Sequence, residues 1–322
     1  MRKCNIPIFI PHRGCPHDCA FCSQKKITGV DTEVTPKEVR QIIKNSLKTI
    51  DRKKSTVEVA FFGGSFTGLP LTVQEEFLKV VVDFMPDISG IRLSTRPDYI
   101  NDEILSLLKR YKCSTIELGV QSSNDQVLKL NDRGHNFQSV IEASEMIKKY
   151  NIELGHQMML GMYGSNPQKD LKTVEDIIGI APSCVRIYPV ITLKGTKLEE
   201  YLKTGSYTPY SVDEAAQLAK KAILAFRAAD IDVIRLGLHS SEELEDGETI
   251  VDGPYHPAFG EIVESLIFRD EIEKKLLNEG ETDGKLVFEC EKNQMSKAVG
   301  HKKMNKIYFK EKYNVELCVL AR

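Results

Sequence analysis

Three cysteines lie close together near the start of the chain, and their spacing is C-x3-C-x2-C. This spacing places three thiols on one short loop. Thiolates ligate iron–sulfur clusters, and three of them can hold three irons of a cubane cluster. The fourth iron then stays open, so the site could bind and reduce a small molecule. We therefore predict an iron–sulfur centre at Cys15, Cys19 and Cys22.

A structural zinc ion is the alternative occupant of this loop, with His12 or His17 as fourth ligand. Zinc sites commonly use paired C-x2-C knuckles, and the sequence has no second knuckle. The other cysteines are dispersed and are expected to be small buried residues: Cys4, Cys113, Cys184, Cys290 and Cys318. A large chain with clustered cysteines indicates metal or catalytic chemistry more than disulfides.

Strand-like and helix-like segments alternate along most of the chain. Seven apolar, β-branched runs are expected to be strands: residues 6–10, 57–62, 91–95, 115–120, 152–160, 184–190 and 233–236. Six longer runs place apolar residues on one helical face: residues 36–50, 74–84, 101–111, 137–150, 169–178 and 211–228. This alternation indicates an α/β fold of parallel β/α units, either a partial or complete β/α barrel or an open doubly wound sheet.

The composition is that of an ordinary globular protein, with 322 residues, 41% hydrophobic and 28% charged. It excludes global disorder, collagen and coiled coil. The formal net charge is −2, so any site for nucleic acid must be a local basic surface. No apolar run approaches the ~20 residues of a membrane span, and the N-terminal run is too short for a signal-peptide core. We therefore expect a cytoplasmic protein with no membrane partner.

The cysteine pattern, with the aromatic Phe21 before its third cysteine, resembles the signature of radical S-adenosylmethionine (radical-SAM) enzymes. The resemblance implies a partial (β/α)6-type barrel and a [4Fe–4S] cluster ligated by Cys15, Cys19 and Cys22. It further implies that S-adenosylmethionine (SAM) chelates the open iron. An electron from a donor such as flavodoxin or ferredoxin would cleave SAM to a 5′-deoxyadenosyl radical. The cofactors carry this chemistry, while the protein positions and shields them.

Each expected strand ends in a distinctive group of residues, and the sites of β/α barrels gather at these strand ends. By the same resemblance, Gly63 and Gly64 would meet the amino group of SAM. Gln121 would reach its ribose and methionine part. Phe21 would pack on adenine, which the glycine segment beginning at Gly161 would also contact.

Four further residues near the expected strand ends complete the predicted cofactor contacts: Arg96, His156, Tyr188 and Lys194. Two of these four residues have a structural alternative. Arg96 could form a salt bridge at the top of the barrel, and His156 could be a buried core histidine. The pair Gly63-Gly64 could likewise be a plain turn.

Narrower motifs indicate one branch of the radical-SAM enzymes. They lie at residues 94–99, 117–122, 133–135, 186–189, 193–196 and 207–210. Together they resemble the radical-SAM half of the catalytic subunit of Elongator, which modifies C5 of the wobble uridine in tRNA. The resemblance covers residues 5–240 and implies a tRNA-modifying transferase. We expect no acetyltransferase half, because the chain ends too early to contain one, and this argues against a carboxymethyl product made from acetyl-CoA.

The last forty residues differ from the rest and are rich in lysine. Two short helices, residues 293–299 and 304–313, are expected between strands 286–289 and 315–320. The segment around Gly300 resembles the core of a KH RNA-binding domain, whose GXXG loop clamps a nucleic-acid backbone; here Lys303 replaces the second glycine. The expected RNA contacts are Lys297, Lys302, Lys303 and Lys306. The alternative is a solvated basic helix pair that only docks on the barrel.

We therefore expect a barrel over residues 1–240, a barrel-flanking, substrate-side segment over 241–280 and a KH-like basic module over 281–322. Tyr255 and His256 are candidate polar contacts in the middle segment. The expected function is radical-SAM modification of RNA, with tRNA as the expected partner. One alternative is an enzyme acting on a small molecule such as a porphyrinogen. Another is a non-catalytic RNA-binding protein that contains zinc or a cluster.

Overall fold

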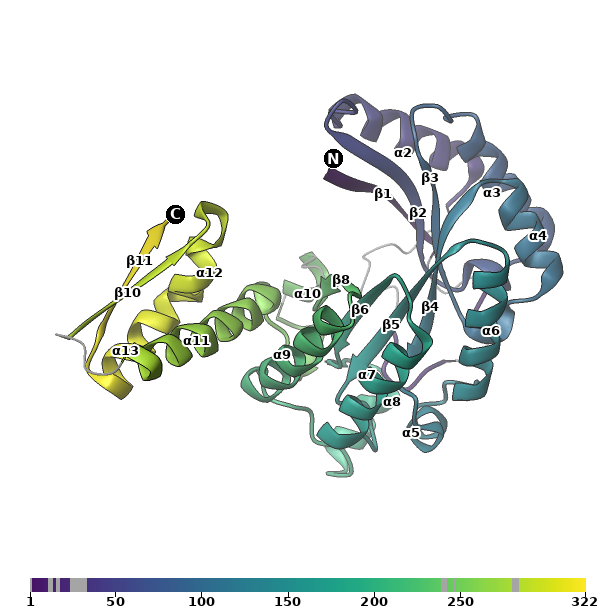
Figure 1. The fold of residues 1–322 in the computed structure, drawn as a ribbon. Coiled ribbons are helices and arrows are strands. Elements are labelled where there is room, and N and C mark those ends of the chain that lie inside the picture. Colours follow the sequence, from purple (N-terminus) through teal and green to yellow (C-terminus); the bar gives the residue numbers. More distant parts are fainter. Residues whose placement is uncertain are drawn as a thin grey trace.

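A seven-stranded parallel sheet forms the main body of the molecule (Figure 1). The computed structural model describes residues 2–10, 14–15, 18–23, 34–238, 242–245, 247–279 and 284–322. Across the sheet the strands are β1 (Arg2–Ile10), β2 (Ser55–Gly63), β3 (Gly90–Thr95), β4 (Cys113–Gln121), β5 (Glu153–Leu160), β6 (Cys184–Pro189) and β8 (Asp232–Leu236). Because all neighbouring pairs are parallel, their carboxyl ends meet at one edge of the sheet.

The order of the strands across the sheet follows their order along the chain. A doubly wound sheet instead reverses direction at a switch point, so that alternative is excluded. The sheet curls, as Figure 1 shows, and β1 and β8 are its two edges. Within the described residues these two edges do not pair with each other. The predicted α/β partial barrel is therefore confirmed.

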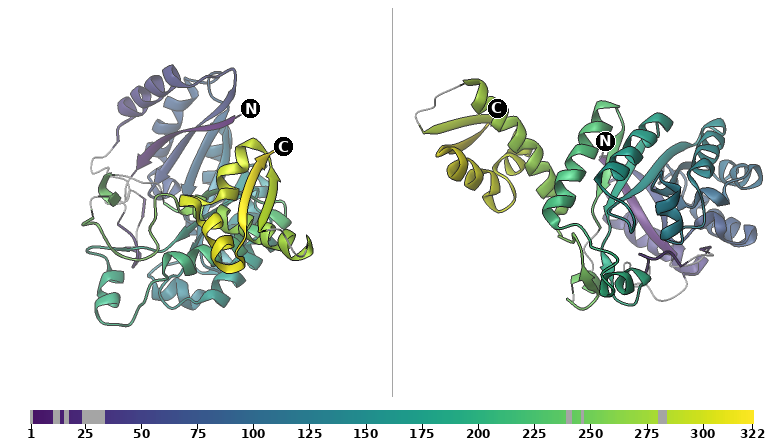
Figure 2. Two further views of the ribbon diagram at one scale, coloured as in Figure 1. Left: turned by 90° about the vertical axis from the view of Figure 1, so that its left-hand side faces the viewer. Right: turned by 90° about the horizontal axis from the view of Figure 1, so that it is seen from below.

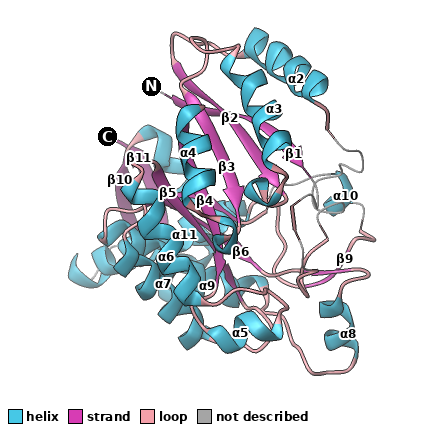
Figure 3. Ribbon diagram, turned by 90° about the vertical axis from the view of Figure 1, so that its right-hand side faces the viewer, coloured by secondary structure: helices cyan, strands magenta, loops and turns pink. Residues whose placement is uncertain are grey.

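Helices cover the outer, convex face of the sheet (Figure 3). They are α2 (Pro36–Thr49), α3 (Leu71–Val82), α4 (Asp102–Arg110), α6 (Phe137–Lys149), α7 (Pro167–Ile180) and α9 (Val212–Ala228). Successive residues of a strand point to opposite faces, and the convex face is apolar. Ile8, Val59, Leu93, Leu118 and Ile187 are all fully buried in this main core.

Local signals fix where several of these helices begin. The side chain of Thr35 accepts a hydrogen bond from the backbone of Glu38, whose side chain binds back to Thr35, and this capping box starts α2. Ser211 and Glu214 form the same arrangement at the start of α9. These capping signals are readable in the sequence, which explains why the expected helix starts agree closely with the structure.

The long helix α11 (Phe259–Glu279) was not expected from the sequence, although it joins the two parts of the molecule. Its first half, including Val263 and Ile267, packs into the main core. Its second half, including Phe268 and Ile272, packs into a separate core with the C-terminal residues. Because the two halves bury different faces, α11 has no single apolar stripe, and its periodicity was not recognisable.

The C-terminal module stands beside the barrel on the end of α11 (Figure 2). It consists of β10 (Lys285–Cys290), α12 (Met295–Val299), α13 (Met304–Tyr313) and β11 (Glu316–Ala321). The two strands pair in parallel, and Leu286, Phe309 and Leu317 are buried against α11. The order strand, helix, helix, strand is the expected one.

Smaller elements complete the described chain: α5 (Asp125–Leu130), β7 (Thr192–Leu193), α8 (Lys197–Lys203), α10 (Glu242–Glu245) and β9 (Ile250–Asp252). The strands β7 and β9 form an antiparallel pair, while α5 and α8 flank the carboxyl ends of the main strands. In the described part of the chain, no helix has the length and apolar character that a membrane span requires.

Candidate functional site

The cysteine loop follows β1 and lies directly against the turn that follows β2. Gly14, with φ +73°, precedes the first cysteine, and a Cβ atom there would overlap the carbonyl oxygen of Ser65. A Cβ atom at Gly68 would overlap the carbonyl oxygen of Gly14. The two backbones therefore touch, which only glycine permits at these positions. Sequence reasoning missed both glycines, although Gly14 stands immediately before Cys15.

Backbone hydrogen bonds hold the second half of the loop. The amide of Cys22 donates to the carbonyl of Cys19 at 2.9 Å. The amide of Ala20 donates to the carbonyl of Asn131 at 3.0 Å, and the amide of Leu198 donates to the carbonyl of Ala20 at 2.9 Å. The loop is thus attached to the ends of α5 and α8, which fixes Cys19 and Cys22 near the carboxyl ends of the strands.

The three thiols are close enough to influence one another. Burial, together with the neighbouring Cys19 and Cys15, raises the pKa of Cys22 to about 12. Burial also raises the pKa of Cys15. Protonated thiols are therefore favoured at a bare site, while a bound cation would favour thiolates, the form that ligates metal.

The donor set fits a cluster in which each sulfur binds a different iron. Among the described residues, no three His, Cys, Asp or Glu side chains are arranged as ligands of a single metal ion. His12 and His17, the expected zinc ligands, lie outside the described residues.

Arg133 brings a positive charge to the thiols. Its Nη1 lies 3.5 Å from Cys19 Sγ, and its Nη2 donates to the carbonyl of Gly119 at 2.9 Å. The charge lowers the pKa of both Cys15 and Cys22 against the larger effect of burial. In the sequence, Arg133 belongs to a motif but nothing marks it as a neighbour of the cysteines.

His135 lies near the same charge. Burial lowers its pKa to about 3, helped by Arg133 and Arg96, so its ring is neutral at physiological pH. Arg96 itself is 2% exposed, and its Nε and Nη2 donate to the two carboxylate oxygens of Asp98 at 2.9 and 2.8 Å. The salt-bridge interpretation of Arg96 is therefore realised, and its charge also lowers the pKa of Cys15.

Gly63, the last residue of β2, and Gln121, the last residue of β4, both have positive φ angles. Gly63 has φ +103°, and its Cβ atom would lie 3.2 Å from the carbonyl oxygen of Ile10, which accepts a 2.7 Å hydrogen bond from the amide of Gly64. Gln121 has φ +66°, and its Oε1 accepts from Gln157 Nε2 at 3.3 Å. A left-handed conformation at a non-glycine residue is strained, and such strain often marks a functional position.

Asp170 on α7 holds the turn after β5. Its carboxylate accepts hydrogen bonds from the amide of Gly161 at 2.9 Å, from Ser165 Oγ at 2.5 Å and from the hydroxyl of Tyr210 at 3.2 Å. The hydroxyl of Tyr207 donates to the carbonyl of Gly161 at 2.9 Å. Gly161 has φ +79°, and a Cβ there would overlap the Tyr210 ring. Sequence reasoning missed Asp170, because its partners lie on different elements.

The remaining predicted residues are not all brought together. Phe21 packs against a buried cluster that includes Met162 and Leu198 at the strand ends. Tyr188 lies on the inner face of β6. Lys194 is exposed beyond β7.

His156 is fully buried on the opposite face of β5, beneath α6, and its Nε2 lies 3.0 Å from Ser144 Oγ. The structure thus separates His156 from the other predicted site residues and matches the core-histidine alternative.

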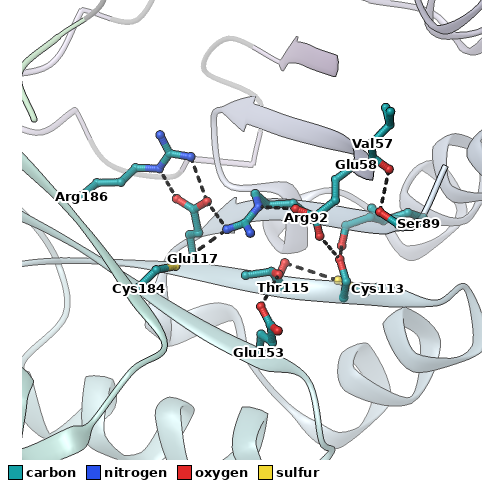
Figure 4. A network of polar contacts seen from close by, with 12 residues as sticks. Val57, Glu58, Ser89, Arg92, Cys113, Thr115, Glu117, Glu153, Cys184 and Arg186 are labelled. Atoms are coloured by element: carbon teal, nitrogen blue, oxygen red, sulfur yellow. Dashed lines mark hydrogen bonds and ion pairs between the residues drawn. The ribbon is translucent and has the colours of Figure 1, made fainter. Parts of the chain in front are cut away.

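An ionic network fills the inner face of the curled sheet (Figure 4). Arg92 on β3 donates from Nε to Glu58 at 3.0 Å and from Nη1 to Glu117 at 2.9 Å. Arg186 on β6 also binds Glu117, through Nε and through Nη2 at 3.0 Å. Glu117 on β4 therefore joins two arginines and ties β3, β4 and β6 together beneath the cysteine loop.

Comparison with protein families agrees with this geometry. The profile of the family described as "Radical SAM superfamily" matches residues 9–177, which contain the cysteine loop and the strand ends described above. The chain belongs to the radical SAM superfamily. A second profile, "Radical_SAM C-terminal domain", matches residues 182–269. Membership in the superfamily implies, in general, an iron–sulfur cluster and SAM as cofactors.

Characterised relatives are similar over part of their length. A "tRNA uridine(34) acetyltransferase" of Methanocaldococcus infernus is 27% identical over 198 residues, covering 55% of this chain and 37% of that protein. "Elongator complex protein 3" of Saccharomyces cerevisiae is 25% identical over 259 residues, covering 66% of this chain and 46% of that protein. The radical SAM chain therefore spans less than half of either relative.

A solved structure shares the fold. The archaeal Methanocaldococcus infernus Elp3, solved with residues 1–46 deleted, superposes with a TM-score of 0.63 at 23% sequence identity. The match covers 85% of this chain and 63% of that one. The superposition supports the same radical SAM architecture, a curled parallel sheet with helices on its outer face.

Proposed function

We propose that this radical SAM protein modifies RNA, with the wobble uridine of tRNA as its target. The observation that carries the proposal is the position of the three thiols, of which Cys19 is buried and Cys15 and Cys22 are half-buried. They lie at the carboxyl ends of the strands, in a chain whose matched region is shared with a protein named as a tRNA uridine(34) acetyltransferase.

The residues that would hold the cofactors follow from the site. Cys15, Cys19 and Cys22 would ligate a [4Fe–4S] cluster. SAM would lie beside it, in contact with the strand-end residues Phe21, Gly63, Gly64, Gln121, Gly161 and Tyr188. When bound, the cluster supplies the electron that cleaves SAM reductively. Arg96 and Lys194 would lie further from SAM and influence it by their charge. His156 would only stabilise the packing of β5.

The surrounding side chains set the charge and the backbone conformation of this site. The charge of Arg133 lowers the pKa of Cys15 and Cys22, and its hydrogen bond to the Gly119 carbonyl fixes the guanidinium in place. Asp170 sets the backbone turn at Gly161 through the hydrogen bonds given above. Cys19 is buried and Cys22 is half-buried, which limits the access of water to these thiols. A radical reaction requires this because water and oxygen divert reactive intermediates.

The C-terminal module supplies basic residues for the RNA. Lys302, Lys303 and Lys306 are exposed, while Lys297 is half-buried and lies 3.7 Å from Glu264. Lys302 and Lys303 have φ of +48° and +64°, so the segment after Gly300 turns sharply and leaves their side chains at the surface. We propose that these lysines contact RNA phosphates, whose neutralisation dominates nucleic-acid affinity.

The test is anaerobic. The protein is reconstituted with iron and sulfide, given SAM and either a strong reductant or reduced flavodoxin or ferredoxin, and 5′-deoxyadenosine is measured with and without bulk tRNA. We expect formation that tRNA stimulates and that Cys19→Ala abolishes; Cys318→Ala, which removes a cysteine of the distant C-terminal module, serves as the control. If tRNA does not change the amount of 5′-deoxyadenosine formed, the substrate is instead a small molecule. If protein with a fully loaded cluster forms none, the enzymatic proposal is contradicted.

A further inference from the structure

A groove of about 470 Å³ lies between the barrel and the C-terminal module. One side is formed by α9 and the outer edge of β8, and the other by α11 and α12. Among the described strands, β8 pairs only with β6, so its outer edge presents free backbone groups beside the groove. Ile234 on this edge is 40% exposed. The groove is therefore open to solvent along the outer edge of β8.

The groove is lined by more cations than carboxylates. Arg227 and Lys297 both pair with Glu264, so two positive charges share one negative charge. Arg235 on β8 forms no ion pair with any described residue, and its Nε donates to the carbonyl of Gly237 at 2.9 Å. Arg235 is half-buried, and this burial lowers the pKa of its guanidinium.

The other charged side chains near Arg235 already have partners. Arg186 binds Glu117 in the inner network, and its charge repels that of Arg235. Glu261, which also lines the groove, lies 3.5 Å from His301 Nδ1. A partly desolvated guanidinium without a counter-ion is costly, so an anionic ligand in this groove would relieve the cost.

The chemistry of the groove favours phosphate. A guanidinium fork matches two phosphate oxygens, and amides along a free strand edge are further donors for such a group. The volume suits a ligand about the size of one nucleotide, since sites for small ligands have ~300–1,000 Å³, and not a duplex. Arg235 is also an electrostatic neighbour of Tyr188 on the inner face of β6. A phosphate at Arg235 would thus lie beside the interior of the barrel.

We propose that this groove binds a backbone phosphate of the substrate RNA, with Arg235 as the main contact and Lys297 as a second one. The inference rests on the proposed function and adds the path of the RNA strand: along the free edge of β8, between the barrel and the C-terminal module. The flanking nucleoside then reaches the open side of the barrel near Tyr188.

The test measures binding of fluorescently labelled tRNA to the reconstituted full chain by anisotropy at several salt concentrations. We expect Arg235→Gln to weaken binding about 10-fold and to reduce the salt dependence by about one released ion. Arg235→Lys retains the charge and should keep most of the salt dependence. Lys44→Gln, an exposed residue of α2 remote from the groove, is the matched control and should bind as the wild type does.

The results distinguish failure of the groove from failure of the RNA function. If the wild type binds tRNA and Arg235→Gln binds with equal affinity and equal salt dependence, the groove is overturned while the RNA function stands. If the wild type binds no tRNA, both proposals fail. Thermal unfolding checks that Arg235→Gln is folded; if it is not, Lys297→Gln carries the same test, with an expected loss of about 3-fold.

Discussion

Arg133 connects the cysteine loop to the sheet, with Nη1 3.5 Å from Cys19 Sγ and Nη2 donating to the carbonyl of Gly119 at 2.9 Å. The guanidinium is buried, so its charge acts on the thiols with little screening. It opposes the effect of burial, which raises the pKa of Cys15 and Cys22. One side chain therefore both positions the loop and favours the thiolates that ligate metal.

We predict that Arg133→Gln lowers the iron content of the reconstituted protein, because the thiols lose the cation that favours their ionised form. Arg133→Lys keeps the charge but not the fork, so its iron content should be intermediate. Iron and sulfide per chain are measured after reconstitution at neutral pH. Arg110→Gln, at an exposed position of α4, is the control. Full iron loading of Arg133→Gln would contradict the role assigned to the charge.

The backbone contact between Gly14 and the turn at Ser65 gives a second prediction. Gly14→Ala should lower the free energy of unfolding by about 2 kcal/mol or more, because alanine is strained at φ +73° and its Cβ overlaps the Ser65 carbonyl. The variant should also lose its cluster, since the loop that carries Cys15 must move. Urea unfolding of the cluster-free protein measures the first effect and iron content measures the second.

A matched substitution is available at Gly179, near the end of α7. No heavy atom lies within 4 Å of a Cβ built there, so Gly179→Ala should be neutral or stabilising by up to about 1 kcal/mol. Similar stability of the two alanine variants would show that the contact at Gly14 relaxes easily and does not fix the loop.

Local patterns predicted much of this protein, and contacts between distant residues account for what was missed. The cysteine spacing and Gly63-Gly64 are short motifs, and strand–helix alternation predicted parallel β/α units. The choice of a partial barrel over a doubly wound sheet came from the family resemblance. Glu117 was not recognisable as a network residue, because Arg92 and Arg186 reach it from strands 25 and 69 residues away. The position of His156 could have been predicted. It alternates in step with the apolar residues of β5, so it points to the helix-covered face of the sheet.

The stability of the protein should depend on the pH through Asp170. Burial raises the pKa of this carboxyl from 3.8 to about 6, so the folded state binds the proton more tightly than the unfolded state does. The resulting stabilisation is present in full below pH 3.8 and is lost as the pH rises through about 6. The shift corresponds to about 3 kcal/mol.

Asp170→Asn removes this titration and leaves all others in place. The wild type should therefore lose on the order of 3 kcal/mol relative to Asp170→Asn between pH 4 and pH 7. Urea unfolding of both proteins across this range gives the difference directly. Parallel curves would mean that Asp170 titrates in the folded protein as it does in the unfolded chain.

The inner ionic network should be sensitive to loss of its central carboxylate. Glu117 is 2% exposed and binds both Arg92 and Arg186, so Glu117→Gln leaves two buried guanidinium groups with one carboxylate, Glu58. We expect the free energy of unfolding in urea to fall by about 3 kcal/mol, the usual cost of breaking a buried ion pair from one side. The exposed pair of Lys172 and Asp176, 2.7 Å apart, is the control, and Asp176→Asn should change stability by less than about 0.5 kcal/mol. Equal effects of the two substitutions would show that water reaches the inner face of the sheet and screens the network as it screens the surface.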